Sequence, residues 1–474
     1  MTISDQLIYD KLKDRFGFQE FRPGQLEILH KLLEGRSTLA ILPTGAGKTL
    51  IYQMYGLLVS GTVVVVSPLL SLIKDQIQRL RLSGERQIAE LTSQVAFTDQ
   101  LYVLNHLAEY KFIFLSPESL QKAEVQGRIA RLKIALMVVD EAHCIVQWGK
   151  SFRPDYLRIG QVRQQFGNPL TLALTATASR NTRSEILRYL ALNVQTTEQY
   201  VASVDRKNIF LDFLTTDNVA DKEELLLNLI DQLPGAGIVY FSSRKIASQV
   251  SELINRQLRQ TAAPYHAGMS TYDRLQVQSQ FQKNQLDVIC ATSAFGMGID
   301  KADIRYVIHY HMPGDIESYV QEIGRAGRDG KSSVAITLYA TGDEMIPTIL
   351  NSYSLPNTDG LPLSNGEQQT EEQQALVNYY REFGLTESQL KKLFKKQAQQ
   401  KEQQILEMLK LIRTTGCHRR FLLQHFDEPF TKHDEQCCGS ISDFTEFGLQ
   451  ESHDSSKLAM MGWKDKLAQI FADN

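Results

Sequence analysis

The sequence predicts an α/β protein with two tandem doubly wound parallel sheets and a helical C-terminal region. Two observations support this fold class. Short runs rich in Val, Ile and Leu alternate with helical stretches from residue 38 to 342, and the pattern restarts near Val204. The runs are almost continuously apolar, which is typical of strands buried on both faces of a parallel sheet. After Gly342 these runs end and the following residues favour helices.

The expected strands fall into two sets. The first set covers Thr38–Leu42, Thr62–Ser67, Lys111–Ser116, Ile134–Asp140 and Leu170–Thr175. A helix is expected over Leu69–Arg81, between two of these strands. The second set covers Ile209–Leu214, Gly237–Ser242, Leu286–Ala291, Ile304–Tyr310 and Val334–Tyr339. Strands that alternate with helices in this way form parallel sheets with helices on both faces.

Four segments are expected along the chain. They are a first α/β lobe over residues 1–203, a second over 204–342, a helical module over 343–443 and a short tail over 444–474. Residues 352–374 are rich in Ser, Asn, Pro, Gly, Glu and Gln and indicate a loop, whereas residues 375–426 favour helices. Apolar residues three or four apart in the tail predict a short amphipathic helix that docks on its own chain.

The composition excludes several classes of protein. With 43% hydrophobic and 22% charged residues, the chain resembles an ordinary soluble globular protein, and it has neither a membrane-spanning apolar run nor a secretory signal. Its 5 cysteines are too few for a disulfide scaffold and favour a reducing compartment, so we expect a cytoplasmic protein. A net charge of −3 argues against a broad basic surface, although a local groove of Lys and Arg suffices to bind phosphates.

A phosphate-binding loop is predicted at Leu42-Pro-Thr-Gly-Ala-Gly-Lys-Thr49, between an expected strand and an expected helix. The backbone of Thr44, Gly45, Ala46 and Gly47 would surround the phosphates of ATP, because glycine permits a close approach. Lys48 would contact the β- and γ-phosphates, and Thr49 would contact Mg²⁺. The simpler interpretation, a glycine turn that opens a helix, is disfavoured by this context and by the next motif.

That next motif is Asp140-Glu-Ala-His143, which ends the apolar run Ile134–Val139. Acids at the carboxyl end of a parallel strand lie where α/β sheets bind ligands. Asp140 is expected to hold Mg²⁺, and Glu141 to orient or deprotonate the attacking water. By themselves these acids would equally suit a solvated turn, but together with the phosphate-binding loop they predict an ATPase.

The second lobe carries the motif Gln321-Glu-Ile-Gly-Arg-Ala-Gly-Arg328. If this stretch were helical, Arg325 and Arg328 would point the same way. An arginine delivered across a domain interface stabilises the charge on the transferring phosphoryl group. We therefore predict catalytic roles for Gln321, Arg325 and Arg328, and a motor in which ATP closes the cleft and hydrolysis releases it.

With these motifs, the chain resembles RecQ-like helicases of superfamily 2 over residues 8 to about 440. The resemblance implies two RecA-like lobes. It also implies that Gln25 of Phe16–Gln25 binds adenine while Arg22 and Phe18 pack around the base. Ser67–Gln76 and Thr175-Ala-Thr177 match strand-contacting and coupling motifs, and so does Ala294–Lys301, in which Asp300 is expected at the nucleotide.

The stretch Cys144–Pro154 resembles the aromatic-rich loop of the same family. Trp148 and Phe152 are expected to stack on bases, and Arg153 to pair with a phosphate or stack. The family has His followed by an acid where this chain has Lys150 and Ser151. An aromatic side chain docked inward from a surface loop is the alternative. In the second lobe, Ser242, Arg244 and His266 resemble backbone-binding loops, although short Ser/Gly turns are also common at strand ends.

The C-terminal cysteines resemble a degenerate form of the zinc module that usually follows the motor in RecQ-like proteins. Cys417 and Cys437 match two of the four expected cysteines, while Ser440 and Asp443 stand where the other two are expected. Of these, Asp443 can bind Zn²⁺, whereas serine is a poor ligand. Cys438 or a nearby histidine could complete the site by a shift of register. A degenerate zinc site and a metal-free remnant stabilised by packing both remain open.

The resemblance implies a 3′-to-5′ DNA helicase of repair and recombination that uses ATP and Mg²⁺, with Zn²⁺ left open. Single-stranded and duplex DNA are the expected partners, together with a single-strand-binding protein, and we expect a monomer associated with the bacterial nucleoid. Two alternatives remain. One is an RNA helicase or remodelling ATPase, and the other is a DNA-binding or annealing protein in which ATP hydrolysis only changes the affinity for DNA. The aromatic-rich loop favours the DNA helicase over the RNA helicase. The annealing protein is a credible alternative because about thirty residues after the zinc-type region are too few for a winged-helix module.

Overall fold

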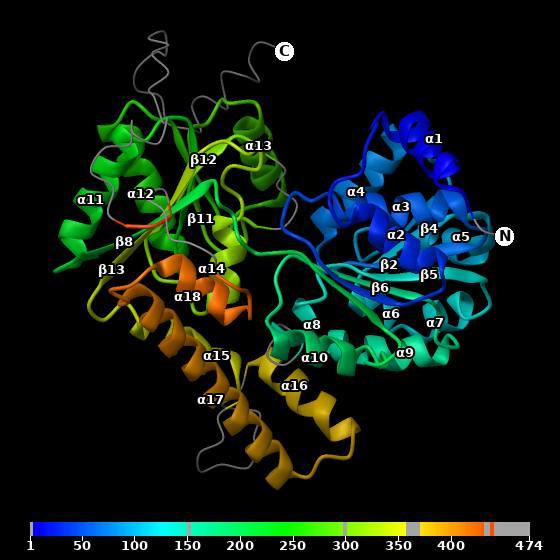
Figure 1. Ribbon diagram of the computed structural model, residues 1–474. Helices are drawn as coiled ribbons and strands as arrows, with labels where there is room; N and C mark the ends of the chain where they lie inside the picture. The colour runs from blue at the N-terminus through cyan, green and yellow to red at the C-terminus, as the bar shows by residue number, and fades with distance from the viewer. Residues whose placement is uncertain are drawn as a thin grey trace. The chain divides into compact units, whose positions relative to one another are not determined.

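The computed structural model describes residues 3–147, 149, 153–296, 301–356, 370–430 and 437–439 (Figure 1). The chain forms two compact units. The first comprises Met1–Val204 and Ser354–Gln397, and the second comprises Asp205–Tyr353 and Ala398–Asn474. The residues that follow the second sheet are therefore divided between the two units.

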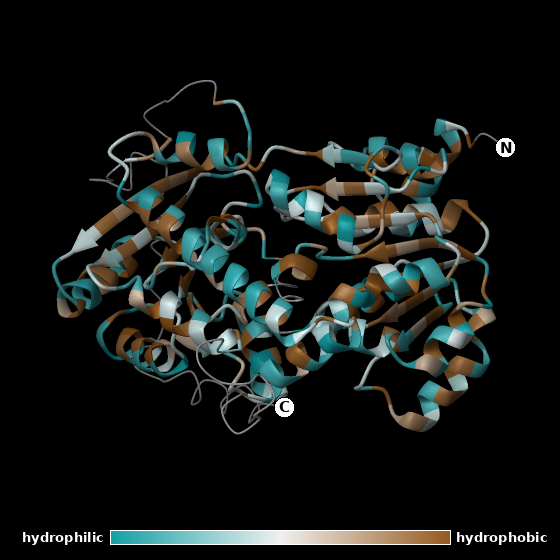
Figure 2. Cartoon of the chain, turned by 90° about the horizontal axis from the view of Figure 1, so that it is seen from below, coloured by the Kyte–Doolittle hydropathy of each residue, from teal (hydrophilic) through white to brown (hydrophobic). Residues whose placement is uncertain are grey.

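The first unit is built on a seven-stranded parallel sheet with the order β3-β4-β2-β5-β6-β1-β7. Its strands are β1 (Thr38–Ile41), β2 (Thr62–Val66), β3 (Ile88–Leu91), β4 (Phe112–Leu115), β5 (Ile134–Val139), β6 (Thr171–Thr175) and β7 (Glu198–Val201). The central strands are buried along most of their length, and Figure 2 shows that hydrophobic residues concentrate on the strands. This explains why their sequences lack the alternation of half-exposed strands.

Helices cover both faces of this sheet. One face packs against α1 (Asp5–Phe16), α2 (Gln25–Leu33), α3 (Lys48–Leu58) and α4 (Leu70–Leu82), whose buried side chains share a core with β2 and β4. Figure 1 shows the opposite face covered by α6 (Pro117–Leu120), α7 (Ala123–Ile129), α9 (Ile159–Gln165) and α10 (Arg180–Tyr189). The remaining elements are α5 (Phe97–Asn105), α8 (Cys144–Gln147) and the 3₁₀ turns Leu107–Glu109 and Pro154–Arg158.

The second unit is built on a six-stranded parallel sheet with the order β10-β11-β9-β12-β13-β8. Its strands are β8 (Ile209–Thr216), β9 (Ala236–Tyr240), β10 (Ala262–Tyr265), β11 (Val288–Ala291), β12 (Ile304–His309) and β13 (Ser333–Ala340). The helices are α11 (Val219–Gln232), α12 (Arg244–Gln257), α13 (Thr271–Gln282), α14 (Ile316–Ile323) and α15 (Met345–Ser354). α11 and α12 share one core with the sheet, and Phe213 on β8 contacts Tyr319 of α14 and His418.

The C-terminal region contains α16 (Glu371–Glu382), α17 (Glu387–Ile412) and α18 (His418–His425). α16 packs in the first unit, where the Arg158 guanidinium lies 5.1 Å from the ring centre of Tyr379 and pairs with Glu382. The predicted loop over 352–374 is wrong at both ends, since α15 reaches Ser354 and α16 begins at Glu371 with a Thr370 capping box. The residues from 440 onward, including the predicted amphipathic helix, lie outside the described residues.

The predicted fold class is confirmed: two parallel α/β sheets are followed by a helical region. Each predicted strand is present with ends that agree within two residues. Three strands were missed, namely β3, β7 and β10, and each lies at the edge of its sheet. Within the part of the chain that the structure describes, no helix combines the length and apolar composition needed to cross a membrane.

Candidate ATP and nucleic-acid site

The phosphate-binding loop connects β1 to α3 as expected from the sequence. Gly45 and Gly47 both adopt left-handed backbone conformations, with φ of 88° and 71°. A Cβ atom on Gly47 would lie 2.6 Å from Nε2 of Gln25, so no other residue fits there without displacing that side chain. Lys48 and Thr49 begin α3, where the helix N-terminus favours negatively charged ligands.

The predicted adenine-binding residues lie directly on this loop. Gln25 is only 2% exposed, and its Nε2 donates to the carbonyls of Ala46 at 2.8 Å and Gly47 at 3.0 Å. Its Oε1 accepts from the backbone N–H of Arg22 at 2.9 Å, and the Arg22 guanidinium donates to the Gly45 carbonyl. Phe18 is 54% exposed nearby in sequence. Gln25 and Arg22 thus hold the phosphate-binding loop by hydrogen bonds to its carbonyls, here called the clasp. The sequence did not indicate this role.

The carboxylate of Asp140 lies at the carboxyl end of β5 and is 5% exposed. Its Oδ2 accepts from Nε2 of Gln76 at 2.7 Å, and its Oδ1 accepts from the backbone N–H of Glu141 at 3.0 Å. Burial and the neighbouring charge of Glu141 raise the Asp140 pKa to about 6, while the charge of Lys48 and the hydrogen bond from Gln76 oppose this shift. A buried carboxylate beside a lysine is suited to a hard divalent cation.

Glu141 and His143 extend this site from Asp140 toward β6. Glu141 has a φ of 48°, which is unusual for a residue other than glycine. Its Oε2 lies 3.4 Å from Nδ1 of His143, and that nitrogen is 2.9 Å from Oγ1 of Thr175. The Thr175 hydroxyl donates in turn to the carbonyl of Thr177 at 3.0 Å. These contacts link the acidic motif to the end of β6.

Sheet order explains why these motifs meet. β2, β5, β6 and β1 are neighbours in that order, so their carboxyl ends bring Ser67, Asp140, Thr175 and the phosphate-binding loop to one edge. Gln76 was not singled out from the sequence, although it lies in the motif Ser67–Gln76. Its apolar neighbours on α4 gave no sign that one amide would reach Asp140.

The aromatic-rich loop is only partly described. Trp148 and Phe152 lie outside the described residues. Arg153 donates to Oε1 of Glu118 at 2.6 Å and to the carbonyl of Pro68 at 2.7 Å, and its guanidinium lies 5.5 Å from the ring centre of Tyr156. In this structure Arg153 therefore anchors the loop to the motif that begins at Ser67, and its guanidinium is occupied by protein groups.

In the second unit, the predicted backbone-binding residues follow β9 and β10. The backbone N–H of Ser242 donates to Nδ1 of His311 at 3.1 Å, and Nε2 of His266 lies 3.1 Å from the hydroxyl of Ser248. A Cβ atom on Gly268 would lie 3.3 Å from Nδ1 of His266 and 3.6 Å from the Arg244 guanidinium, so these side chains converge on one glycine turn. Burial and the charge of Arg244 lower the His266 pKa, which favours the neutral imidazole.

The predicted arginines follow α14 and are not on a helix. α14 ends at Ile323, and residues 324–328, here called the arginine turn, leave it through Gly327 with a φ of 55°. The two arginines therefore do not lie on the helix on which they would point the same way, since Gly324 is already its C-cap residue. Arg325 is 7% exposed and donates to the carbonyl of Gly296. Gln321 lies on α14, and Asp300 lies outside the described residues.

Comparisons with known proteins agree with this layout. Residues 22–185 match the DEAD/DEAH box helicase family, and residues 221–330 match the helicase conserved C-terminal domain. The chain is 39% identical to the probable ATP-dependent DNA helicase RecS of Bacillus subtilis (strain 168), over 100% of this chain and 98% of that protein. The chain belongs to the RecQ-like family of ATP-dependent DNA helicases.

Other relatives show how far this similarity extends. The RecQ-like chain is 33% identical to the ATP-dependent DNA helicase RecQ of the same Bacillus subtilis strain, over 94% of this chain and 68% of that protein. Among solved structures, Saccharomyces cerevisiae Dbp5 bound to RNA and ADP BeF3 matches with a TM-score of 0.58, at 18% identity over 78% of this chain and 97% of that one. That likeness concerns the fold alone.

This RecQ-like chain also contains a compact group of sulfur atoms. Cys417, Cys437 and Cys438, here called the cysteine cluster, place their Sγ atoms within 4.8 Å of one another. The Sγ of Cys417 lies 3.5 Å from both other sulfurs. Asp443, the third predicted ligand, lies outside the described residues, and Cys438 stands beside the two predicted cysteines. Burial raises the Cys437 pKa to about 12, with a further contribution from its hydrogen bond with Cys417.

Proposed function

We propose that this helicase hydrolyses ATP at the carboxyl edge of its first sheet and uses the energy to move 3′ to 5′ on single-stranded DNA, separating duplex DNA during repair and recombination. The observation that carries the coupling is the buried 2.7 Å hydrogen bond between Gln76 and Asp140. Gln76 lies on α4, which extends from the strand-contacting motif at Ser67, and Asp140 is the carboxylate of the ATP site. A movement of α4 caused by DNA would therefore reach the ATP site through one bond.

In this proposal the first unit binds and activates ATP. The loop from Thr44 to Gly47 holds the phosphates, and Lys48 neutralises the β- and γ-phosphates. Asp140 and the hydroxyl of Thr49 would hold Mg²⁺, which when bound neutralises charge on the phosphate oxygens. Glu141 orients the attacking water and accepts its proton, and its contact with His143 fixes the carboxylate.

The base of ATP would be bound by Phe18, Arg22 and Gln25. The hydrogen bonds of Arg22 and Gln25 to the phosphate-binding loop support a role as a nucleotide sensor, since ATP must compete with carbonyl groups for the same donors. Arg325 and Arg328, with Gln321 and Asp300, would complete the nucleotide site from the second unit. An arginine so placed stabilises the charge that develops during phosphoryl transfer.

DNA would be bound by residues from both units. Trp148 and Phe152 would stack on bases, which typically contributes about 1–3 kcal/mol per base. Arg153, tied to Pro68, would hold this loop in place rather than contact a phosphate itself. Ser242, Arg244 and His266 would contact the sugar-phosphate backbone, which positions the strand without reading its sequence.

The cysteine cluster fits a thiophilic metal ion such as Zn²⁺. Four thiolates at the usual Zn–S distance stand about 3.8 Å apart around the ion, close to the 3.5 Å separations found here. Cys417, Cys437 and Cys438 would supply three ligands. The fourth would come from outside the described residues, where Asp443 and His433 are candidates.

A strand-displacement assay tests the function. Labelled duplexes of DNA or RNA carry a single-stranded tail at either the 3′ or the 5′ end of the loading strand. ATP-dependent displacement of DNA from the 3′-tailed substrate alone is expected. Efficient displacement of RNA would favour an RNA helicase, and tight ATP-dependent DNA binding without displacement would favour an annealing or clamping protein. A single-strand-binding protein should increase the yield by trapping the product, and sedimentation of the protein alone should show a monomer.

A further inference from the structure

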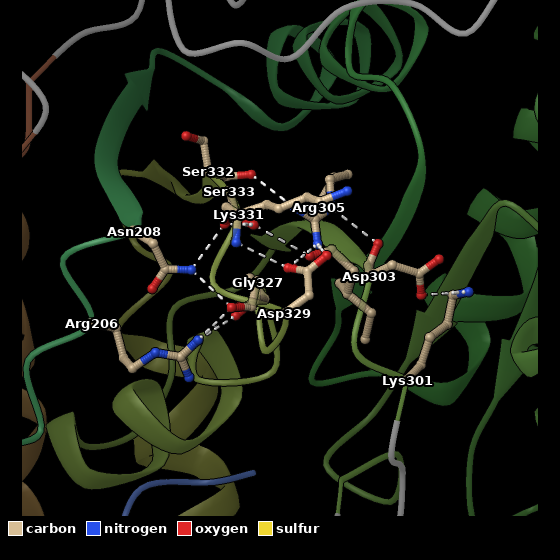
Figure 3. Close-up of polar contacts among 12 residues, drawn as sticks. Arg206, Asn208, Lys301, Asp303, Arg305, Gly327, Asp329, Lys331, Ser332 and Ser333 are labelled. Atoms are coloured by element: carbon tan, nitrogen blue, oxygen red, sulfur yellow. Dashed lines mark hydrogen bonds and ion pairs between the residues drawn. The ribbon is translucent and has the colours of Figure 1, made fainter. Parts of the chain in front are cut away.

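The first residues of the second unit contact the arginine turn directly. Arg206 donates from its guanidinium to the carbonyl of Gly324 at 3.1 Å, Ala326 at 3.0 Å and Gly327 at 2.8 Å. Figure 3 shows the contact between Arg206 and Gly327. A single planar group thus holds three carbonyls of a five-residue turn. A guanidinium is suited to this task, because its donors are fixed in one rigid fork.

Asn208 supports the same turn from two residues further on. Its Nδ2 donates to the carbonyl of Gly327 at 2.8 Å and to that of Lys331 at 2.9 Å. The fit is close, since a Cβ atom on Gly327 would lie 2.4 Å from Nδ2 of Asn208 and 2.7 Å from the Lys331 carbonyl. Gly327 is therefore required both by its left-handed backbone and by the approach of Asn208.

The far end of the turn is held by a separate ion pair. Arg305 donates to both carboxylate oxygens of Asp329, at 2.7 and 2.8 Å, and to the carbonyl of Ser332 at 3.1 Å (Figure 3). The backbone N–H of Gly327 also donates to the carbonyl of Ile304 at 2.8 Å. The far end of the arginine turn is thus fixed to β12. Its near end, residues 324–326, is held by backbone hydrogen bonds to α14 and by the guanidinium of Arg206.

Arg206 is itself held from the C-terminal region. Arg419 on α18 is 7% exposed and donates to the carboxylate of Asp205 at 2.5 Å and to the carbonyl of Arg206 at 3.0 Å. The same guanidinium donates to the Sγ of Cys437 at 3.3 Å and to its carbonyl at 3.2 Å. A continuous set of hydrogen bonds thus runs from the cysteine cluster through Arg419 and Arg206 to the arginine turn.

We propose that Arg206 is a positioning residue that sets the arginine turn for ATP hydrolysis, and that Arg419 connects this residue to the cysteine cluster. The inference rests on the proposed role of Arg325 and Arg328. Charge stabilisation requires donors placed precisely where charge develops, and a displacement of about 1 Å can cost about 10²-fold in rate. Loss of the Arg206 fork removes the side-chain contacts to the carbonyls of Gly324, Ala326 and Gly327, which permits such a displacement.

The test compares Arg206→Gln with the full-length wild type and with Arg256→Gln. Arg256 is a matched control on α12 of the same unit, where its side chain is 75% exposed and pairs with Glu252 at 3.6 Å. Arg206→Gln is expected to lower kcat for DNA-stimulated ATP hydrolysis by about 10- to 10²-fold while the Kd for ATP changes by less than about threefold. Arg256→Gln is expected to leave both values unchanged.

A double-mutant cycle separates positioning from folding. In an Arg325→Ala/Arg328→Ala background, Arg206→Gln should cause no further loss, because its effect passes through those arginines. If the arginine variants hydrolyse ATP at the wild-type rate, the proposed finger is wrong. If they lose activity but Arg206→Gln does not, or if Arg206→Gln lowers kcat by the same factor in both backgrounds, the positioning role is wrong. Thermal unfolding of every variant identifies any loss that comes from an unfolded fraction.

The connection through Arg419 has its own variants. Arg419→Gln alone removes the guanidinium that pairs with the Asp205 carboxylate at 2.5 Å, so Arg419→Gln/Asp205→Asn is measured beside it. Both should lower kcat, and neither should lower it further when Arg206→Gln is present. A loss in thermal stability with wild-type kcat in the folded protein would reduce Arg419 to a structural role and overturn this part of the proposal.

Discussion

Replacement of Gln76 by leucine is expected to weaken the use of Mg²⁺ without unfolding the protein. The side chain keeps nearly the same volume on α4 but loses the amide that donates to Asp140. Gln76 is 4% exposed and Asp140 is 5% exposed, so water does not readily reach Asp140 to replace the lost donor. Asp140 then keeps the hydrogen bond from the backbone N–H of Glu141 at 3.0 Å.

The size of the effect follows from this geometry. A hydrogen bond to a buried charged group contributes about 1.5–3 kcal/mol, which corresponds to about 10- to 10²-fold in an equilibrium constant. Groups that orient a metal-binding carboxylate typically have this effect on metal affinity. We therefore expect the Mg²⁺ concentration at half-maximal ATP hydrolysis to rise by about 10- to 10²-fold.

The assay is a titration of ATP hydrolysis with Mg²⁺, at saturating ATP and single-stranded DNA. Gln78→Leu is the control, because it makes the same substitution on an exposed position of the same helix. Stimulation by DNA should also fall in Gln76→Leu, since α4 loses its bond to the ATP site. An unchanged Mg²⁺ requirement together with unchanged DNA stimulation would refute the coupling that we assign to this bond.

Four further outcomes are expected. Lys48→Ala should lower ATP hydrolysis by about 10²–10³-fold and leave DNA binding intact, as measured by phosphate release and fluorescence anisotropy. Trp148→Ala should keep basal ATP hydrolysis and lose most stimulation by single-stranded DNA; full stimulation would remove it from the DNA site. Elemental analysis should find zinc that a chelator removes without unfolding the two sheets, and Cys438→Ser should bind less of it; equal zinc in wild type and variant would exclude this sulfur as a ligand. Burial raises the Asp315 pKa from 3.8 to about 6, so the folded state binds the proton more tightly and the free energy of unfolding should fall as pH rises through this range. Asp315→Asn keeps the helix cap, so in urea unfolding at pH 4 and 7 it should lack this fall, which amounts to about 1–3 kcal/mol; parallel pH profiles would contradict it.

The sequence predicted the buried part of the fold well, because strands covered on both faces must be apolar throughout. The missed strands show the limit of that signal. β7 contains Glu198 and Gln199, and β10 contains Pro264, which lacks a backbone donor and is tolerated at a sheet edge. Edge strands need not be apolar, so their sequences do not distinguish them from loops.

The site was predictable where a motif is local and less so where partners are distant in sequence. The phosphate-binding loop and Asp140 were found because their chemistry lies within a few consecutive residues. The clasp of Gln25 on Gly47 and the bond from Gln76 depend on tertiary packing over 22 and 64 residues of sequence separation. The sequence did not decide whether Arg325 and Arg328 lie on a helix, and the structure ends α14 at Ile323, before both of them.

The first unit is interrupted by the second along the chain, and this has a consequence for synthesis on the ribosome. Residues 1–204 emerge first, but α16, whose Tyr379 packs on Arg158, belongs to Ser354–Gln397 and emerges only after the whole second sheet. At usual translation speeds this delay is roughly 10–40 s. The nascent first unit must wait with the surface around Arg158 uncovered while the second sheet is made. Substitutions that weaken the early core of β1 to β7 are therefore expected to reduce the yield of folded protein more than their effect on the stability of the finished molecule.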